Sequence, residues 1–352
     1  MRRKVTLRDI AAAAGVHVST VSRALDPATS GTLSEELVAR IRAIAADTGY
    51  RRNHIASSLR TRRSMTVGVV LPDISNWIFP PMVRGIERVL EEAGYATFIV
   101  NTDNLVAHEE RLISVLRERG VDGLLHAAVL RDSPLITALA AEGLPIVTLN
   151  RRIDDTEIPC VINDEHAGIR MMVSHLVDNG HSQIAAISGP QALSTGMMRQ
   201  RALLATLAGM GLSQPACSHA EADGFSEAEG RRCCAELFDR GNHFTAILCA
   251  NDRLALGAMA ELQARGLSCP DDISLTGYND MPFLDMIPPG LTTVRIEQAE
   301  AGRVAAELLV RMMRDGAADV PLETVLPVRM IRRGSVIPPR RLREMRSAQA
   351  SG

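Results

Sequence analysis

The chain has 352 residues, of which 46% are hydrophobic and 23% are charged. This composition is typical of a globular protein, and no apolar run approaches the roughly 18 residues that cross a bilayer, so no membrane partner is expected. The net charge of −2 is unevenly spread: residues 1–63 hold twelve Lys or Arg and five Asp or Glu, whereas the remaining residues hold 27 and 36. A basic head on an acidic body predicts polyanion binding at the N-terminal end.

The N-terminus and the cysteines restrict the location and the chemistry. Residues 1–4 are basic, but polar residues follow them where a secretory signal has an apolar region, so we expect a cytoplasmic protein. The six cysteines form no CxxC pair and have no histidine at zinc-like spacing, which predicts small buried side chains in a reducing compartment. We therefore expect no metal and no cofactor.

Residues 5–25 are predicted to form two short helices joined by a tight turn. Thr6 followed by Asp9 is a helix-starting pattern, and Gly15 suits the turn because glycine adopts a left-handed conformation without strain. The second helix begins near Val18. Its outer face carries hydroxyls and one arginine: Ser19, Thr20, Ser22 and Arg23. Such a helix fits the major groove of DNA, and the alternative is a solvated helical hairpin.

A third helix is predicted to begin after Ser34, whose hydroxyl can cap it and which two acidic residues follow. The helical head is expected to end at residue 52. Residues 53–64 are basic and poor in apolar side chains, and a helix of this length is marginal alone in water. This segment is either a flexible linker or a hinge that folds on DNA.

From Thr66 onward, apolar strands alternate with helical segments in two successive sets. The chain passes between the sets near residue 160 and returns near 290–325. Alternation at this spacing predicts parallel sheets that helices cover on both faces. The sequence therefore predicts an α/β core of two similar lobes with a cleft between them, which is where open α/β sheets bind ligands.

Motifs along nearly the whole chain resemble those of the LacI/GalR family of bacterial transcriptional regulators. They include Val5–Ile10, Ala14–Val16, Ser19–Arg23, Arg84–Ile86, Ser188–Pro190, Asn251–Asp252, Gly277–Asp280 and Leu291–Val294. The resemblance implies a helix-turn-helix head and hinge, followed by a two-lobed core like that of the periplasmic sugar-binding proteins. It also implies a homodimer whose paired heads read a near-palindromic operator in double-stranded DNA.

These features give the expected domain boundaries. The helix-turn-helix domain is expected at 1–52, the hinge at 53–64, and the effector-binding and dimerisation core at 65–340. Within the core, the first lobe comprises about 65–162 and 291–323, and the second about 163–290 and 324–338. Residues 341–352 are expected to be a disordered tail that lacks the apolar heptads of a tetramerising coiled coil.

The DNA contacts of the family carry over to single positions of this chain. Val18 and Ser19 match the base-reading positions of the recognition helix, and Arg23 matches an arginine one turn later. The positions expected to bind phosphate are Thr6, Thr20 and Ser22. In the hinge, Asn53 and Ala56 match minor-groove positions, and Leu59 matches a leucine that wedges into a central base step.

His17 departs from the family pattern, because many relatives have a capping serine at this position. The change either weakens the N-cap of the second helix by roughly 1 kcal/mol or places a titratable group near phosphate.

The resemblance also implies that a small effector, a carbohydrate or sugar acid, binds in the cleft. In the first lobe the matching residues are Asp73, Asn76, Trp77, Phe79 and Asn150, with Arg151 beside the last. In the second lobe they are Arg199, Phe225, Asn251 and Asn279. Trp77 departs from the family pattern, and Asn279 replaces a common Asp, which favours an anionic effector. Taken singly, an asparagine at a strand end is also a common turn residue.

The prediction is a DNA-binding transcriptional repressor whose operator affinity a small effector controls by linkage. Effector-driven closure of the lobes is expected to separate the hinges and release DNA, whereas a corepressor would act in the opposite direction. The chain has no GxxxxGK[ST], GxGxxG or HExxH motif, so no enzymatic activity is expected. The alternatives are a solute-binding protein of a transport system and a sugar kinase fused to a DNA-binding head.

Overall fold

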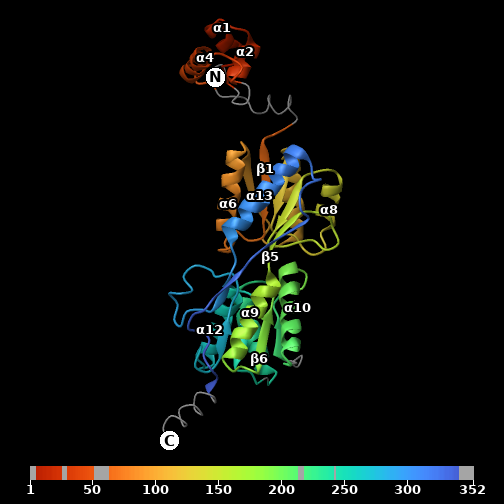
Figure 1. Ribbon diagram of the computed structural model, residues 1–352, viewed down its shortest axis with the longest axis vertical. Helices are drawn as coiled ribbons and strands as arrows, with labels where there is room; N and C mark the ends of the chain where they lie inside the picture. The colour runs from red at the N-terminus through yellow and green to blue at the C-terminus, as the bar shows by residue number, and fades with distance from the viewer. Residues whose placement is uncertain (1–4, 26–29, 51–62, 213–217, 242, 341–352) are drawn as a thin grey trace. The chain divides into compact units, whose positions relative to one another are not determined.

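The computed structural model describes residues 5–25, 30–50, 63–212, 218–241 and 243–340. The chain separates into two compact units, which divide between Ser64 and Met65. In Figure 1 the first unit contains helices, and the second contains both helices and strands. Most of the predicted hinge and the whole predicted tail lie outside the described residues, so both assignments remain predictions.

The first unit contains the predicted helix-turn-helix pair and a third helix packed against it. Its helices are α1 (Leu7–Ala14), α2 (Val18–Ala24) and α4 (Glu35–Asp47). All three contribute fully buried side chains to a common core, among them Ile10, Val21 and Ile41. Gly15 ends α1 with a φ of 63°, a left-handed conformation that glycine adopts without strain. The sequence therefore predicted both the turn and the start of α2 correctly.

Helix α1 begins with a reciprocal capping box. The Asp9 amide donates to Thr6 Oγ1 at 3.4 Å, and the Thr6 amide donates to Asp9 Oδ2 at 2.8 Å. Replacing Thr6 by alanine removes one of these acceptors, so we expect the free energy of unfolding of the head to fall by about 1 kcal/mol. Amide hydrogen exchange in α1 should then be about fivefold faster in T6A, whereas T6S, which keeps the hydroxyl, should match the wild type. Equal exchange in T6A and T6S would contradict the capping role.

The first lobe of the second unit is built on a parallel six-stranded sheet in the order β11-β5-β4-β3-β1-β2. Its strands are β1 (Thr66–Leu71), β2 (Ala96–Asn101), β3 (Gly123–His126), β4 (Ile146–Leu149), β5 (Cys160–Asn163) and β11 (Glu323–Leu326). Helices α6 (Phe79–Glu92) and α13 (Gln298–Asp315) pack on one face, and α7 (Val106–Glu118) and α8 (Pro134–Ala141) on the other. Neighbouring strand residues such as Val69 and Val70 enter opposite cores, which explains the continuous apolar runs.

The second lobe repeats this architecture on a parallel four-stranded sheet in the order β7-β6-β8-β9. Its strands are β6 (Ile184–Ser188), β7 (His219–Glu221), β8 (Ala246–Cys249) and β9 (Ser274–Thr276). Helices α9 (Glu165–Asp178) and α10 (Ser194–Gly209) cover one face, and α11 (Glu227–Asp239) and α12 (Asp252–Ala264) the other. The described cysteines carry free thiols, and those at 160, 233, 234 and 249 are buried, as small apolar side chains are.

The chain crosses between the lobes in three places within the described residues. The crossings follow β5, β10 (Thr293–Arg295) and β11, and the last of them leads into β12 (Arg329–Ile331). Strands β10 and β12 pair antiparallel, with Thr293 opposite Ile331. Strand β11 belongs to the first-lobe sheet as far as Leu326, three residues beyond the expected boundary at 323. No helix among the described residues is long and apolar enough to span a membrane.

His181 is 2% exposed in the second lobe. Its Nε2–H donates to the Ile337 carbonyl oxygen at 2.9 Å, and its Nδ1 lies 2.8 Å from Thr245 Oγ1, an arrangement that suits a neutral ring. Burial lowers the pKa of His181 to about 4, below the ordinary value of 6.5. Between these values the unfolded chain binds the proton more readily than the folded one. The contribution of His181 to stability is therefore complete above pH 6.5 and is lost as the pH falls toward 4, by about 3 kcal/mol in total.

The variant His181→Gln tests this titration, because it removes the group but keeps a polar side chain. We expect the difference in free energy of unfolding between wild type and H181Q to shrink by about 3 kcal/mol from pH 7 to pH 4. Urea unfolding of both proteins at each pH measures the difference, in which the titration of all other groups cancels. A difference that stays constant over this range would contradict the assignment.

Candidate functional site

The recognition helix α2 presents a polar face to solvent. Ser19 and Arg23 are exposed, and Thr20 and Ser22 are half-buried. Val18 is half-buried and packs against the core of the head, which leaves only part of its side chain for a base contact. Hydroxyls and a guanidinium on one short helix can bind both base edges and phosphates. The predicted contacts Asn53, Ala56 and Leu59 lie outside the described residues, so their roles remain predictions.

His17 replaces the capping serine without leaving the helix uncapped. Its Nδ1 accepts a hydrogen bond from the Ser19 amide at 3.3 Å and lies 2.7 Å from Ser19 Oγ. The ring nitrogen therefore takes the place of the missing hydroxyl oxygen, and the helix keeps an N-cap acceptor. The same contact fixes Ser19, a predicted base-reading residue, at the start of α2.

The core contains a cavity of about 230 Å³ between its two lobes. The first lobe lines it with residues that follow β1, β2, β3 and β4, and the second lobe with residues that follow β6, β7 and β8. These residues are Pro72, Asp73, Asn76, Phe79, Asn104, Val106, Glu109, Ala128, Leu130, Arg151, Pro190, Ala192, Leu193, Asp223, Gly224, Phe225 and Arg253. The walls therefore come from the carboxyl ends of parallel strands in both sheets, which is the usual ligand site of open α/β sheets.

A second, smaller cavity of about 20 Å³ adjoins the first and shares Asn76, Phe79, Arg151 and Phe225 with it. Its other lining residues are Ile78, Asn150, Thr195, Arg199, Asn251 and Asn279. The structure thus brings eight of the nine predicted effector residues to the two cavities. Sequence reasoning did not assign Asn104, Glu109, Thr195, Asp223 or Arg253 to the site.

The exception is Trp77, which is 52% exposed and lines neither cavity. Two consecutive turns shape its loop: the Asn76 amide donates to the Asp73 carbonyl oxygen, and the Phe79 amide donates to the Asn76 carbonyl oxygen. The indole meets Phe283 of the second lobe edge-on, with ring centroids 6.1 Å apart. We therefore correct the prediction: Trp77 makes an outer contact between the lobes.

Arg199, which is predicted to bind the effector, makes hydrogen bonds to other residues of the protein. Its Nε and Nη2 donate to the two oxygens of Glu165 at 2.6 and 3.0 Å, and Nη1 donates to the Ala250 carbonyl oxygen at 2.7 Å. The guanidinium also stacks 3.8 Å from the centroid of the Tyr278 ring. Burial acts to lower the pKa of Arg199, but the Glu165 carboxylate outweighs burial and raises it. Arg199 is therefore a charged residue that the protein holds firmly in the wall of the small cavity.

Four asparagines line the small cavity, and three of them, Asn150, Asn251 and Asn279, also have a backbone or capping role. Asn150 and Asn279 have left-handed backbones, with φ of 64° and 114°. Asn251 is the N-cap of α12 and accepts from the Leu254 amide at 2.8 Å. Behind it, Asp252 is fully buried, and this burial raises its pKa to about 6. At these positions the same asparagine therefore shapes the local backbone and lines the cavity.

Salt bridges and hydrogen bonds tie the two lobes together around the cavity. Arg253 is at the start of α12. Its Nη1 lies 3.2 Å from Asp73 Oδ2 of the first lobe, and its Nη2 lies 2.8 Å from Glu227 Oε2 of the second lobe. Burial acts to raise the pKa of Asp73, but hydrogen bonds from Ser75 and the charge of Arg253 outweigh it and lower the pKa. The Arg131 amide also donates to the Ala192 carbonyl oxygen at 2.9 Å. These contacts hold the lobes in the observed arrangement.

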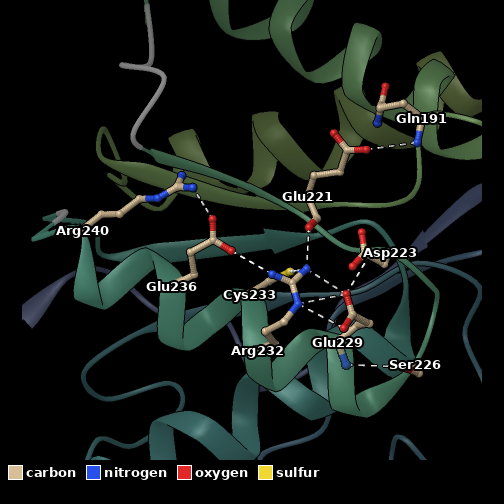
Figure 2. A network of polar contacts seen from close by, with 9 residues as sticks. All are labelled: Gln191, Glu221, Asp223, Ser226, Glu229, Arg232, Cys233, Glu236 and Arg240. Carbon is tan, nitrogen blue, oxygen red and sulfur yellow. Dashed lines mark hydrogen bonds and ion pairs between the residues drawn. The ribbon is translucent and has the colours of Figure 1, made fainter.

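A polar network fixes the second-lobe loop around Asp223 (Figure 2). The same loop contains Phe225, and both residues line the cavity. Glu229 accepts from the Asp223 amide at 2.7 Å, and Arg232 donates to Glu229 and to the Glu221 carbonyl oxygen, both at 2.8 Å. The Phe225 ring lies against Gly189, where an added Cβ would come within 2.3 Å of the ring. The aromatic wall of the cavity is therefore held from both sides.

Comparisons with known proteins identify the family. The model for bacterial regulatory proteins of the lacI family matches residues 6–53, and a periplasmic binding protein-like domain matches residues 173–336. The HTH-type transcriptional regulator CelR of Thermobifida fusca is 31% identical over 341 residues, which cover 94% of this chain and 96% of that one. The chain belongs to the LacI family. The resemblance and the fold predicted from the sequence are thereby confirmed.

Two further members support this assignment. The ribose operon repressor of Bacillus subtilis is 29% identical over 309 residues, which cover 88% of this chain and 92% of that one. The lac repressor dimer bound to operator and an anti-inducer superposes with a TM-score of 0.83 at 27% identity, over 95% of this chain and all of that one. As a LacI-family member, the chain is a DNA-binding transcriptional regulator. Among its described residues, no group of His, Cys, Asp and Glu could hold a metal ion.

Proposed function

We propose that this protein is a repressor that binds a near-palindromic operator as a homodimer and that a small carbohydrate-like effector controls its operator affinity. The observation that carries most weight is the cavity built from the strand ends of both lobes, in a chain whose separate head carries a polar recognition helix. A ligand that contacts both lobes stabilises the arrangement in which both walls are in place. The similar proteins agree with this proposal, since one is named a ribose operon repressor and another is a repressor bound to operator.

In the head, Val18, Ser19 and Arg23 are proposed to contact bases, and the hydroxyls of Thr6, Thr20 and Ser22 to contact phosphates. Asn53 and Ala56 are proposed to enter the minor groove, where Leu59 would open a central base step. In the core, the asparagine amides and Arg199 are proposed to bind effector oxygens, and the Phe225 ring to pack against the effector.

The proposed mechanism is linkage between the two sites. Effector binding favours closure of the lobes, separates the paired hinges of the dimer and withdraws Leu59 from the minor groove, so that operator affinity falls. Thermodynamic reciprocity requires that operator binding weakens effector binding by the same factor. The protein is proposed to act in the cytoplasm and to catalyse no reaction.

Selection of operator DNA from random duplexes tests the DNA-binding part of this proposal. We expect enrichment of a near-palindrome and a steep loss of affinity with salt. The variant R23A should bind the selected site about tenfold or more weakly, whereas R84A, which changes an exposed arginine on α6, should bind like the wild type. If no palindrome is enriched, either alone or with a mixture of sugars and sugar acids, the proposal is wrong.

A further inference from the structure

Three arginines line the two cavities, and two of them have carboxylate partners. Arg199 is paired with Glu165, and Arg253 with Asp73 and Glu227. Arg151 lines both cavities, yet no carboxylate of the described residues lies within ion-pairing distance of it. It follows β4, immediately after Asn150, and is therefore at the carboxyl end of the central part of the first-lobe sheet.

The hydrogen bonds of Arg151 are long and reach only neutral oxygens. Its Nη1 donates to the Ala128 carbonyl oxygen at 3.3 Å, and its Nη2 to Asn104 Oδ1 at 3.4 Å. The side chain is buried, with 5% of the residue exposed, and its Nε–H has no hydrogen-bond partner among the described residues. A guanidinium bound to an anion makes hydrogen bonds of about 2.7–2.9 Å, usually in pairs. The donors of Arg151 are therefore in place but largely unused.

A buried, unpaired cation is unfavourable unless a charge of opposite sign compensates it. Burial lowers the pKa of Arg151 to about 10, and the charge of Glu109 acts in the opposite direction. At neutral pH the guanidinium therefore keeps its proton and its charge. None of the described residues supplies a close counter-ion, and the cavity beside Arg151 has room for a ligand that does.

We propose that the effector carries an anionic group, a carboxylate or a phosphate monoester, and that Arg151 binds this group in the cavity between the lobes. The inference rests on the proposed function, because it assigns the chemical class of that effector. The anion would accept hydrogen bonds from the Arg151 guanidinium in place of its present long ones to Ala128 and Asn104. Arg151 is thus a specificity-determining residue that selects charged sugars over neutral ones.

The acidic residues of the same cavity do not take the place of this anion. Asp73 is paired with Arg253, and Glu109 Oε1 lies 3.3 Å from Nε2 of the buried His126. Asp223 lines the cavity from the second lobe. Carboxylates of this kind can accept hydrogen bonds from hydroxyl groups. The cavity therefore offers acceptors for the polyhydroxyl part of a ligand and, in Arg151, a cation that has no carboxylate partner among the described residues for its acidic end.

The test uses inorganic phosphate as a probe on the full chain. Thermal unfolding is measured in 50 mM phosphate and in chloride of equal ionic strength for the wild type, R151M, R151K and R84M. We expect the phosphate-dependent rise in Tm to saturate and to be about 2–3 °C larger in the wild type and R84M than in R151M. R151K, which keeps the charge but loses the planar fork, should show a smaller rise than the wild type, and it decides the question if R151M does not fold.

An equal phosphate response in the wild type, R151M and R151K would overturn the proposal. Release of the selected operator is then measured with D-glucose, D-glucuronate and D-glucose 6-phosphate. This comparison distinguishes a carboxylate from a phosphate as the anionic group of the effector. For the anionic compound that releases the operator, the concentration that gives half-release should be about thirtyfold higher in R151M than in the wild type. Release by a neutral sugar, unchanged in R151M, would refute the anion inference but leave the proposed function intact. Failure of operator selection would refute the function itself.

Discussion

Replacing Gly302 by alanine is expected to destabilise the core by about 3 kcal/mol, because the new methyl group has no space. An added Cβ at Gly302 would lie 2.0 Å from the Met82 carbonyl oxygen, which belongs to the backbone of α6 and cannot move alone. The contact is reciprocal, since a Cβ at Gly85 of α6 would lie 2.1 Å from the Ala299 carbonyl oxygen of α13. These two glycines therefore set the close approach of α6 and α13 that covers one face of the first lobe.

Thermal unfolding of the full chain checks this expectation, with Tm predicted to fall by about 6 °C or more in G302A. The matched control is G209A at the end of α10, where an added Cβ meets no atom within 4 Å. That change should leave Tm unchanged or raise it slightly, because alanine favours a helix over glycine. The packing argument fails if G302A melts at the same temperature as G209A.

Removing the carboxylate of Glu165 is expected to have a comparable or larger effect. In E165A, Arg199 would keep its charge in a buried site and lose two hydrogen bonds of 2.6 and 3.0 Å. An uncompensated buried charge of this kind costs about 3–5 kcal/mol. The variant should also lose effector binding, because Glu165 holds Arg199 at the wall of the small cavity.

The control is E87A, which breaks the exposed pair between Arg84 and Glu87 on α6. Exposed pairs contribute about 1 kcal/mol or less, so E87A should unfold almost like the wild type. Urea unfolding at pH 7 compares the two variants. If E165A and E87A lose the same free energy of unfolding, the buried pair does not stabilise the core as inferred.

Local patterns in the sequence predicted the fold well because each has a local physical cause. The Thr6–Asp9 pattern begins α1 and Gly15 ends it, and both act through the backbone of neighbouring residues. The continuous apolar strands predict sheets buried on both faces, and parallel strands place their ends at one edge. The family resemblance assigned Asn150 and Asn279 to one site, and the position of both residues at strand ends agreed with that assignment.

Contacts between side chains that are distant in the sequence could not be predicted in this way. Trp77 lies one position from Asn76, yet two consecutive turns direct it to Phe283. The sequence marked Arg199 but not its partner Glu165, which lies 34 positions away. It gave no sign that Arg151 lacks a carboxylate, since that depends on which acidic side chains the fold brings near it. His17 capped its helix through a ring nitrogen, a substitution that a pattern based on hydroxyls overlooks.

The most direct test of the account is whether a small molecule in the cleft changes operator affinity. Full-length protein on its selected operator is titrated with neutral sugars, sugar acids and sugar phosphates, while fluorescence of Trp77, the one tryptophan of the chain, reports on the contact between the lobes. The account predicts that at least one compound lowers operator affinity about tenfold or more and changes this fluorescence. Both effects should be lost in N279G, which removes a cavity side chain but suits the local φ. Release of the operator that persists in N279G, or an operator affinity that no compound changes, would contradict it.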